Sequence, residues 1–166
     1  MIQNLPNARW QHSKKKAALT EGNNTLIEME FGSKATNVKM GKQKFEITTD
    51  RFWCPKIMIT QKDEVVALQK RLGFWGTKSE FVLDGETYVA KTKQGTRFNI
   101  TYSKGDTKIL TYKVDALKNK PVINFQIKSF SIPEEHLMLL MALGFYSIKN
   151  VAAEALANDF IVTAVA

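Results

Sequence analysis

The chain has 166 residues, of which 44% are hydrophobic, and 24 Lys and Arg against 16 Asp and Glu give it a net charge of +8. This composition excludes a disordered chain and supplies the core of one domain covering residues 1–166. A single cysteine, Cys54, excludes an internal disulfide and a cysteine-cluster metal site within one chain. Because no apolar signal-peptide run opens the sequence, we expect a cytoplasmic protein that can lie at the periphery of a membrane.

The first 24 residues show little hydrophobic periodicity, and the basic run Lys14-Lys15-Lys16 is typical of a solvated loop. From residue 25 onward, short segments alternate apolar and polar residues, which is the period of a strand with one buried face. Tight-turn residues separate these segments, and Asp84-Gly85 supplies the positive φ angles of a hairpin turn. The pattern predicts an antiparallel meander of about ten strands, at residues 25–31, 35–40, 43–48, 56–61, 64–72, 78–84, 86–93, 98–102, 110–114 and 123–128.

A helix is predicted after these strands, over about residues 133–150. Pro133 suits the first helical position, and no charge interrupts the 12 residues from Leu137 to Ile148. A helix that is apolar on every side must be buried on every side, and this run is shorter than the roughly 20 residues that span a bilayer. We therefore predict a mainly β fold, a closed antiparallel β-barrel of about 10–12 strands around a central hydrophobic C-terminal α-helix.

Four other segments are less strongly patterned. Residues 151–156 continue the helix or begin a second one, and residues 160–165 have the composition of a short strand. The aromatic segments Phe52-Trp53-Cys54-Pro55 and Gly73-Phe74-Trp75-Gly76 either plug an end of the barrel or enter a lipid interface from a mobile loop.

Positive charge is concentrated before the helix. The 132 residues up to Ile132 hold 23 basic and 12 acidic residues, a net charge of +11, whereas the remainder carries −3. Such a field attracts anionic lipid, nucleic acid or acidic protein, although it can also serve solubility alone. Most aromatic residues fall on the inward phase of the strands, which counts against nucleic acid. The candidate anion-binding residues are Lys14, Lys15, Lys16, Lys42, Lys44, Lys70 and Arg71.

No catalytic, metal or cofactor site is predicted. The sequence has no nucleotide-binding fingerprint and no Ser–His–Asp order, and neither His12 nor His136 belongs to a metal-ligand pattern. Glu134 and Glu135 are adjacent and point in different directions on a helix, so we expect them to compensate the helix dipole. We accordingly expect a protein that is not an enzyme and needs no cofactor.

The order of these elements resembles the tubby-like C-terminal domain superfamily, in its LURP-one-related and phospholipid scramblase branches. The resemblance is one of layout and hydropathy over residues of about 45–150. It implies a twelve-stranded barrel around a central helix, and binding of phosphoinositide headgroups through basic residues on the barrel surface. The cysteine cluster and the acidic calcium segment of scramblases are missing, so calcium-dependent scrambling is not expected. The residues that carry the resemblance are the strand Lys56-Ile57-Met58-Ile59-Thr60-Gln61, the segments Lys62-Asp63-Glu64-Val65-Val66 and Lys70-Arg71-Leu72, the hairpin through Asp84-Gly85, and the helix from Glu134 to Ile148.

The first functional hypothesis is therefore a non-enzymatic binding or scaffold module for an anionic membrane surface or another phosphate-bearing ligand. A second is a lipocalin-like barrel that carries a small apolar ligand, which requires an interior free of the helix. A protein-interaction domain and an enzyme whose site is assembled from scattered residues are further alternatives.

Overall fold

The computed structural model describes residues 7–50, 56–73, 77–93, 97–115, 122–151 and 161–164. Within these ranges the chain forms thirteen strands and one helix. In chain order the elements are β1 (Ala8–His12), β2 (Lys16–Glu21), β3 (Asn24–Phe31), β4 (Thr36–Met40), β5 (Gln43–Asp50), β6 (Lys56–Gln61), β7 (Glu64–Leu72), β8 (Lys78–Leu83), β9 (Glu86–Lys93), β10 (Arg97–Lys104), β11 (Thr107–Asp115), β12 (Val122–Ile127), α1 (Glu134–Val151) and β13 (Ile161–Ala164).

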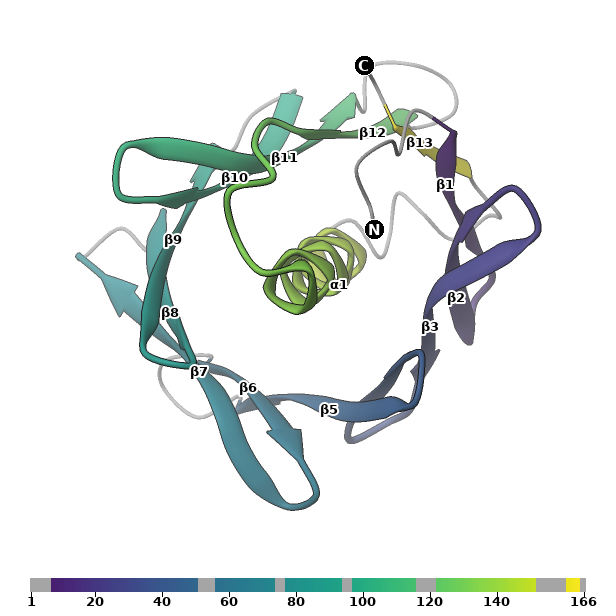
Figure 1. The fold of residues 1–166 in the computed structure, drawn as a ribbon, viewed down its shortest axis with the longest axis horizontal. Coiled ribbons are helices and arrows are strands. Elements are labelled where there is room, and N and C mark those ends of the chain that lie inside the picture. Colours follow the sequence, from purple (N-terminus) through teal and green to yellow (C-terminus); the bar gives the residue numbers. More distant parts are fainter. Residues whose placement is uncertain are drawn as a thin grey trace.

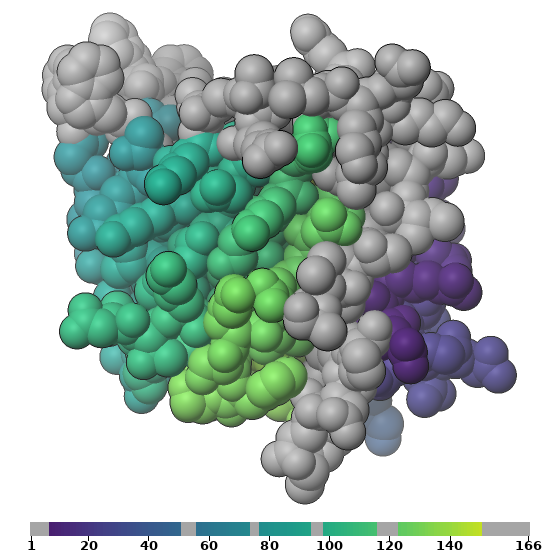
Figure 2. Space-filling model, turned by 90° about the horizontal axis from the view of Figure 1, so that it is seen from above, coloured from purple at the N-terminus to yellow at the C-terminus, as the bar shows by residue number. Residues whose placement is uncertain are grey.

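Alternating hydrophobicity builds the wall of strands. In β5, Phe45 and Ile47 are buried toward the interior, whereas Lys44 and Glu46 are exposed on the outside. The predicted hairpin between β8 and β9 is confirmed, with φ angles of 47° at Asp84 and 79° at Gly85. Figure 2 shows the outer side chains of β9, β10 and β11 as oblique rows across the wall.

The prediction of a closed antiparallel barrel of about 10–12 strands is wrong. Antiparallel pairing runs from β1 to β12, but these two edge strands are not neighbours, so the twelve-stranded antiparallel sheet is open. Between its edges lies β13, antiparallel to β1 and parallel to β12, and only this thirteenth strand makes the ring continuous (Figure 1). The last turn of α1 and the first residue of β12 lie at the same edge of the wall. Because β13 follows α1 and starts at this edge, it runs in the same direction as β12.

The helix prediction is confirmed to within a residue, because α1 spans Glu134–Val151. Figure 1 shows α1 inside the ring of strands. Leu140, Leu143 and Ile148 of α1 have no exposed surface. No helix among the described residues is long and apolar enough to cross a membrane.

Within the run from Leu137 to Ile148, ten residues are buried and two, Met138 and Ser147, are half-buried. The helix is therefore packed on all sides by the inward side chains of the wall, as its lack of a polar stripe requires. The interior of the ring is the core of the protein.

Tyrosine hydroxyls join the helix to the wall. The sequence has four tyrosines, and the hydroxyl of each one makes a hydrogen bond between α1 and a strand. The Tyr112 hydroxyl donates to the carbonyl of Met141 at 2.8 Å and accepts from Nε1 of Trp10 at 3.0 Å. Burial raises the pKa of Tyr112 well above its ordinary value, so this hydroxyl stays protonated. The other three pairs are Tyr88 with His136, Tyr102 with Ser147, and Tyr146 with Thr49.

Gly144 lets α1 approach β11 closely. A Cβ atom at this position would overlap the ring of Tyr112, at 2.6 Å from Cδ2. A side chain at residue 144 would therefore push the helix away from the strand that supplies the Tyr112 hydroxyl. The glycine and the tyrosine together fix the depth of the helix in the ring.

The predictions for the two ends of the chain and for the aromatic segments have different outcomes. The prediction that the first 24 residues carry little pattern is wrong for residues 8–21, which include β1 and β2, with Trp10 and Leu19 buried. The predicted strand near the C-terminus exists as β13. Both aromatic segments (52–55 and 73–76, apart from Gly73) and the possible second helix (residues 152–156) fall outside the residues that the structure describes.

Candidate anionic-ligand site

The wall has two ends that differ in their contacts with the helix. Successive connections of an antiparallel sheet lie at opposite ends of it. We call the end where α1 begins the His136 end, which holds the turns Gly41-Lys42 and Asp84-Gly85. We call the end where α1 finishes the Lys149 end, which holds the β1–β2 connection (residues 13–15) and the β3–β4 connection (residues 32–35).

Lys149 attaches the last turn of α1 to the wall. Its Nζ donates to the carbonyl of Lys14 at 2.9 Å and lies 3.1 Å from the ring centroid of Phe31. Burial lowers the pKa of Lys149 to about 8, while the carbonyl and the ring face both favour the charged form. Beneath it, Phe145 stacks on Trp10 with ring centroids 4.3 Å apart. These contacts place the β1–β2 connection beside the end of the helix.

Five lysines from three elements gather at the Lys149 end, and we call them the Lys149 cluster. The β1–β2 connection and the start of β2 contribute three, the β3–β4 connection one, and α1 one. The two connections are adjacent because the last residue of β3 donates a backbone hydrogen bond to the carbonyl of Lys15 at 2.8 Å. Among the described residues, none of the five forms a salt bridge. The cluster consists of Lys14, Lys15, Lys16, Lys34 and Lys149.

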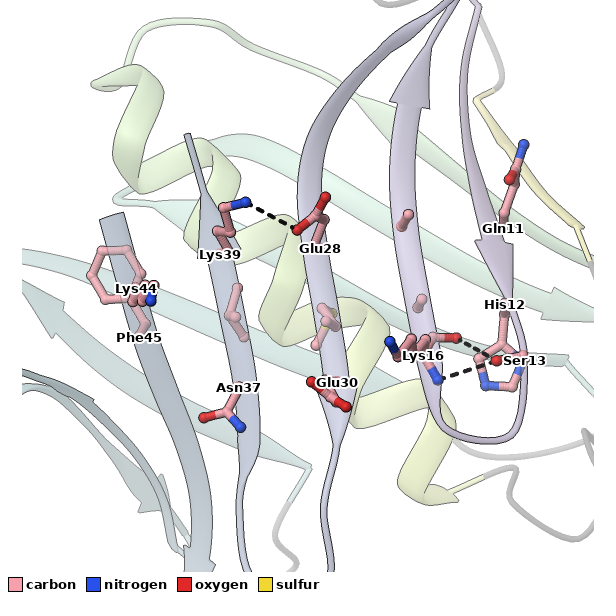
Figure 3. A pocket seen from close by; sticks show the side chains of 14 residues that line it. Gln11, His12, Ser13, Lys16, Glu28, Glu30, Asn37, Lys39, Lys44 and Phe45 are labelled. Atoms are coloured by element: carbon pink, nitrogen blue, oxygen red, sulfur yellow. Dashed lines mark hydrogen bonds and ion pairs between the residues drawn. The ribbon is translucent and has the colours of Figure 1, made fainter. Parts of the chain in front are cut away.

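A hollow of about 830 Å³ adjoins this cluster along the wall of β1–β5. Three lysines and two carboxylates line it, namely Lys16, Lys39, Lys44, Glu28 and Glu30. Lys39 and Lys44 are directly opposite each other in the β4–β5 register, and Lys16 is opposite Glu30 in the β2–β3 register. Figure 3 shows Lys39 turned toward Glu28, with which it forms a salt bridge of 3.4 Å. Like charges directly opposite each other on a sheet are destabilising, and Lys44 forms no salt bridge among the described residues. Since Glu28 offsets the charge of Lys39, Lys44 is the lysine whose charge an anion in the hollow would balance.

The structure brings only part of the predicted site together. Lys14, Lys15 and Lys16 lie in the Lys149 cluster, and Lys44 reaches the hollow beside it. Lys42 lies in the turn at the His136 end.

Lys70 and Arg71 are also separate from the cluster. They belong to β7, which lies on the other side of the ring from β1 and β2 (Figure 1).

Sequence reasoning missed Lys34 and Lys149. The predicted length of the helix was the signal for Lys149, since it places the helix end at the same end of the wall as the β1–β2 connection.

A chain of polar groups at the His136 end leads from the buried Tyr88 through the buried His136 to the exposed Asp84. Nδ1 of His136 is 2.7 Å from the Tyr88 hydroxyl, and its Nε2 is 3.0 Å from Oδ2 of Asp84. Both ring nitrogens of His136 are therefore within hydrogen-bonding distance of an oxygen, one from β9 and one from the β8–β9 turn. This order resembles a nucleophile, a base and an orienting carboxylate.

The arrangement does not activate a nucleophile. Tyr88 has no exposed surface, and its pKa is raised, first by burial and then by the charges of Glu86 and Asp84. A raised pKa keeps the hydroxyl protonated, and its burial keeps a substrate away from it. The three residues therefore attach the first turn of α1 to the β8–β9 hairpin.

No group of three or more His, Cys, Asp or Glu side chains that could hold a metal ion occurs in the described part of the chain. In comparisons with known proteins, no family model, curated protein or solved structure matches this chain.

Proposed function

We propose that this chain is a non-enzymatic binding module that attaches to phosphate-bearing headgroups of an anionic membrane surface through the Lys149 cluster and the adjoining hollow. The observation that carries the proposal is the convergence of five lysines from three elements without a salt bridge among the described residues. Because none of the five forms a salt bridge among the described residues, no ion pair with a carboxylate has to be broken when an anion binds.

The magnitude of the attraction suits a reversible attachment. Each lysine near an anionic lipid surface contributes roughly 1 kcal/mol at physiological ionic strength, and this contribution falls off within a Debye length. Five lysines at one end of the wall therefore act together only when that end faces the lipid. The hollow supplies one further lysine outside a salt bridge, Lys44, for a headgroup that projects from the surface.

We further propose kinship with the tubby-like C-terminal superfamily. Twelve consecutive antiparallel strands and a C-terminal helix inside the ring support this proposal, while β13 and its parallel pairing are additions to the expected pattern. The carrier hypothesis has no supporting observation, since α1 occupies the centre of the ring.

Vesicle co-sedimentation tests the proposed function. The full chain should bind anionic vesicles and not neutral ones, and the binding should be lost at high salt. The variant Lys14→Glu/Lys15→Glu/Lys16→Glu should bind about a hundredfold more weakly, since three attractive charges become repulsive.

A matched control separates the site from the net charge. The variant Lys62→Glu/Lys108→Glu/Lys113→Glu changes the net charge equally, at exposed positions outside the cluster and the hollow. It should retain most of the binding. Equal losses in both variants, or no binding of the native chain at low salt, would contradict the proposal. Binding of inositol phosphates without binding of vesicles would show that the ligand is a free phosphate compound.

A further inference from the structure

Apolar side chains are exposed on the outer wall of β7 and β8. The structure has four exposed large hydrophobic residues among those it describes, and three of them lie on these two neighbouring strands. They are Val65, Leu68 and Val82, with exposed fractions of 57%, 37% and 39%. The antiparallel register puts Leu68 opposite Met58 of β6, and the pairing of Gln69 with Phe81 places it across from Val82. We call these exposed residues the β7–β8 patch. Single exposed hydrophobic residues are ordinary, whereas a contiguous group marks a contact surface.

Charges of opposite sign lie at the two sides of this patch. Toward the Lys149 end, three exposed lysines and one glutamate leave a net charge of +2. Toward the His136 end, three exposed carboxylates and one lysine leave −2. The first group is Lys70, Lys78, Lys91 and Glu80, and the second is Asp63, Glu64, Asp84 and Lys62.

A surface with this order of charges is complementary to itself. Two copies can face each other across a two-fold axis that lies in the contact plane, perpendicular to the strands. The apolar centres then meet, and the basic side of each copy meets the acidic side of the other. A membrane or an acidic peptide would match the basic side and would be repelled by the acidic one.

We propose that the β7–β8 patch is the contact between two copies of this chain in a two-fold symmetric dimer. The patch lies on the other side of the ring from β1 and β2, so both lysine clusters of the dimer stay accessible (Figure 1). This contact is independent of the proposed lipid binding.

Sedimentation velocity of the full chain over a range of concentrations tests the proposal. The native chain should show a reversible monomer–dimer equilibrium. The variant Val65→Thr/Leu68→Thr/Val82→Thr keeps residues that favour strands and should abolish the dimer. The control Phe130→Thr removes the fourth exposed hydrophobic residue, which lies elsewhere, and should leave the equilibrium unchanged. A native chain that is monomeric throughout, or a triple variant that still dimerises, would overturn the proposal.

A charge swap tests the orientation of the two copies. Lys70→Glu/Lys78→Gln makes the basic side negative, and Asp63→Asn/Glu64→Lys makes the acidic side positive. Each variant alone should dimerise about tenfold more weakly or worse, because like charges then meet. An equimolar mixture of the two should restore association, since all charges across the axis are again opposite. A mixture that stays as weak as its components would overturn the proposed orientation.

Discussion

The two ends of α1 are attached to the wall by different chemistry. At the His136 end, the attachment is a chain of hydrogen bonds that leads from Tyr88 through His136 to Asp84. At the Lys149 end, a cation lies over an aromatic ring and donates to a backbone carbonyl, above stacked aromatic side chains. The first end is suited to fixing the position of the helix. The second places a positive charge among other lysines, and it is there that we propose the ligand binds.

The largest effect is expected from the aromatic stack at the Lys149 end. Phe145 has no exposed surface and lies against Trp10. Phe145→Ala should lower the free energy of unfolding by about 3–5 kcal/mol, because it removes a buried ring and leaves a cavity. Urea denaturation measures the change. Phe130→Ala, at an exposed phenylalanine, should change stability by less than about 0.5 kcal/mol, and equal effects of the two would contradict the account.

A smaller effect is expected at the His136 end. Tyr88→Phe leaves Nδ1 of His136 buried without its 2.7 Å partner and should cost about 1–3 kcal/mol in denaturant unfolding. Tyr146→Phe serves as the comparison, because its hydroxyl bond to Thr49 is only partly buried and its loss should cost less. The reverse order of the two losses would show that the polar chain does not hold the first turn.

The two ends should also differ in their response to alkaline pH. The pKa of Lys149 is lowered by burial to about 8 from the ordinary 10.5, so the folded state binds fewer protons than the unfolded state between these values. Stability should therefore rise with pH across this window, relative to the variant Lys149→Met. Thermal unfolding of both chains from pH 7 to pH 10.5 measures the difference. A difference that falls with pH, or an NMR titration of Lys149 near 10.5, would contradict it.

The smallest effect is expected from the exposed contact at the His136 end. Nε2 of Gln43 donates to a carboxylate oxygen of Glu135 at 3.3 Å, in an exposed position. Glu135→Gln should change the free energy of unfolding by less than about 0.5 kcal/mol, measured by the same urea denaturation. A loss as large as that of Tyr88→Phe would place the attachment of the helix at Glu135 instead of His136.

Local patterns predicted most of the elements. The β8–β9 hairpin followed from Asp84-Gly85 and the alternation on both sides of it, and α1 followed from Pro133 and the uninterrupted apolar run. The strands β1 and β2 were missed because their inward positions include His12 and Ala17, which carry a weak hydrophobic signal. The short β13 was only one of the possible structures for its segment, and its pairing depends on where the helix ends.

The sites depended on the three-dimensional arrangement. The run Lys14-Lys15-Lys16 was predicted as a candidate from the sequence, but its proximity to Lys149 follows from the packing of α1 inside the ring. The sequence also grouped Lys42 with Lys44, although a turn residue and an outward strand residue two positions away face different surroundings. The tyrosine hydrogen bonds between the helix and the wall depend on the pairing register of all the strands around the ring. No local sequence pattern specifies that register.

NMR of the lysine side chains during titration with inositol trisphosphate tests the central claim most directly. The phosphate groups are the proposed ligand chemistry, and the lysines at the two ends report separately. The account predicts shifts that saturate for Lys14, Lys15, Lys16, Lys34 and Lys149, with no shift for Lys42 or Lys62. Equal shifts at both ends, or shifts confined to the His136 end, would contradict it.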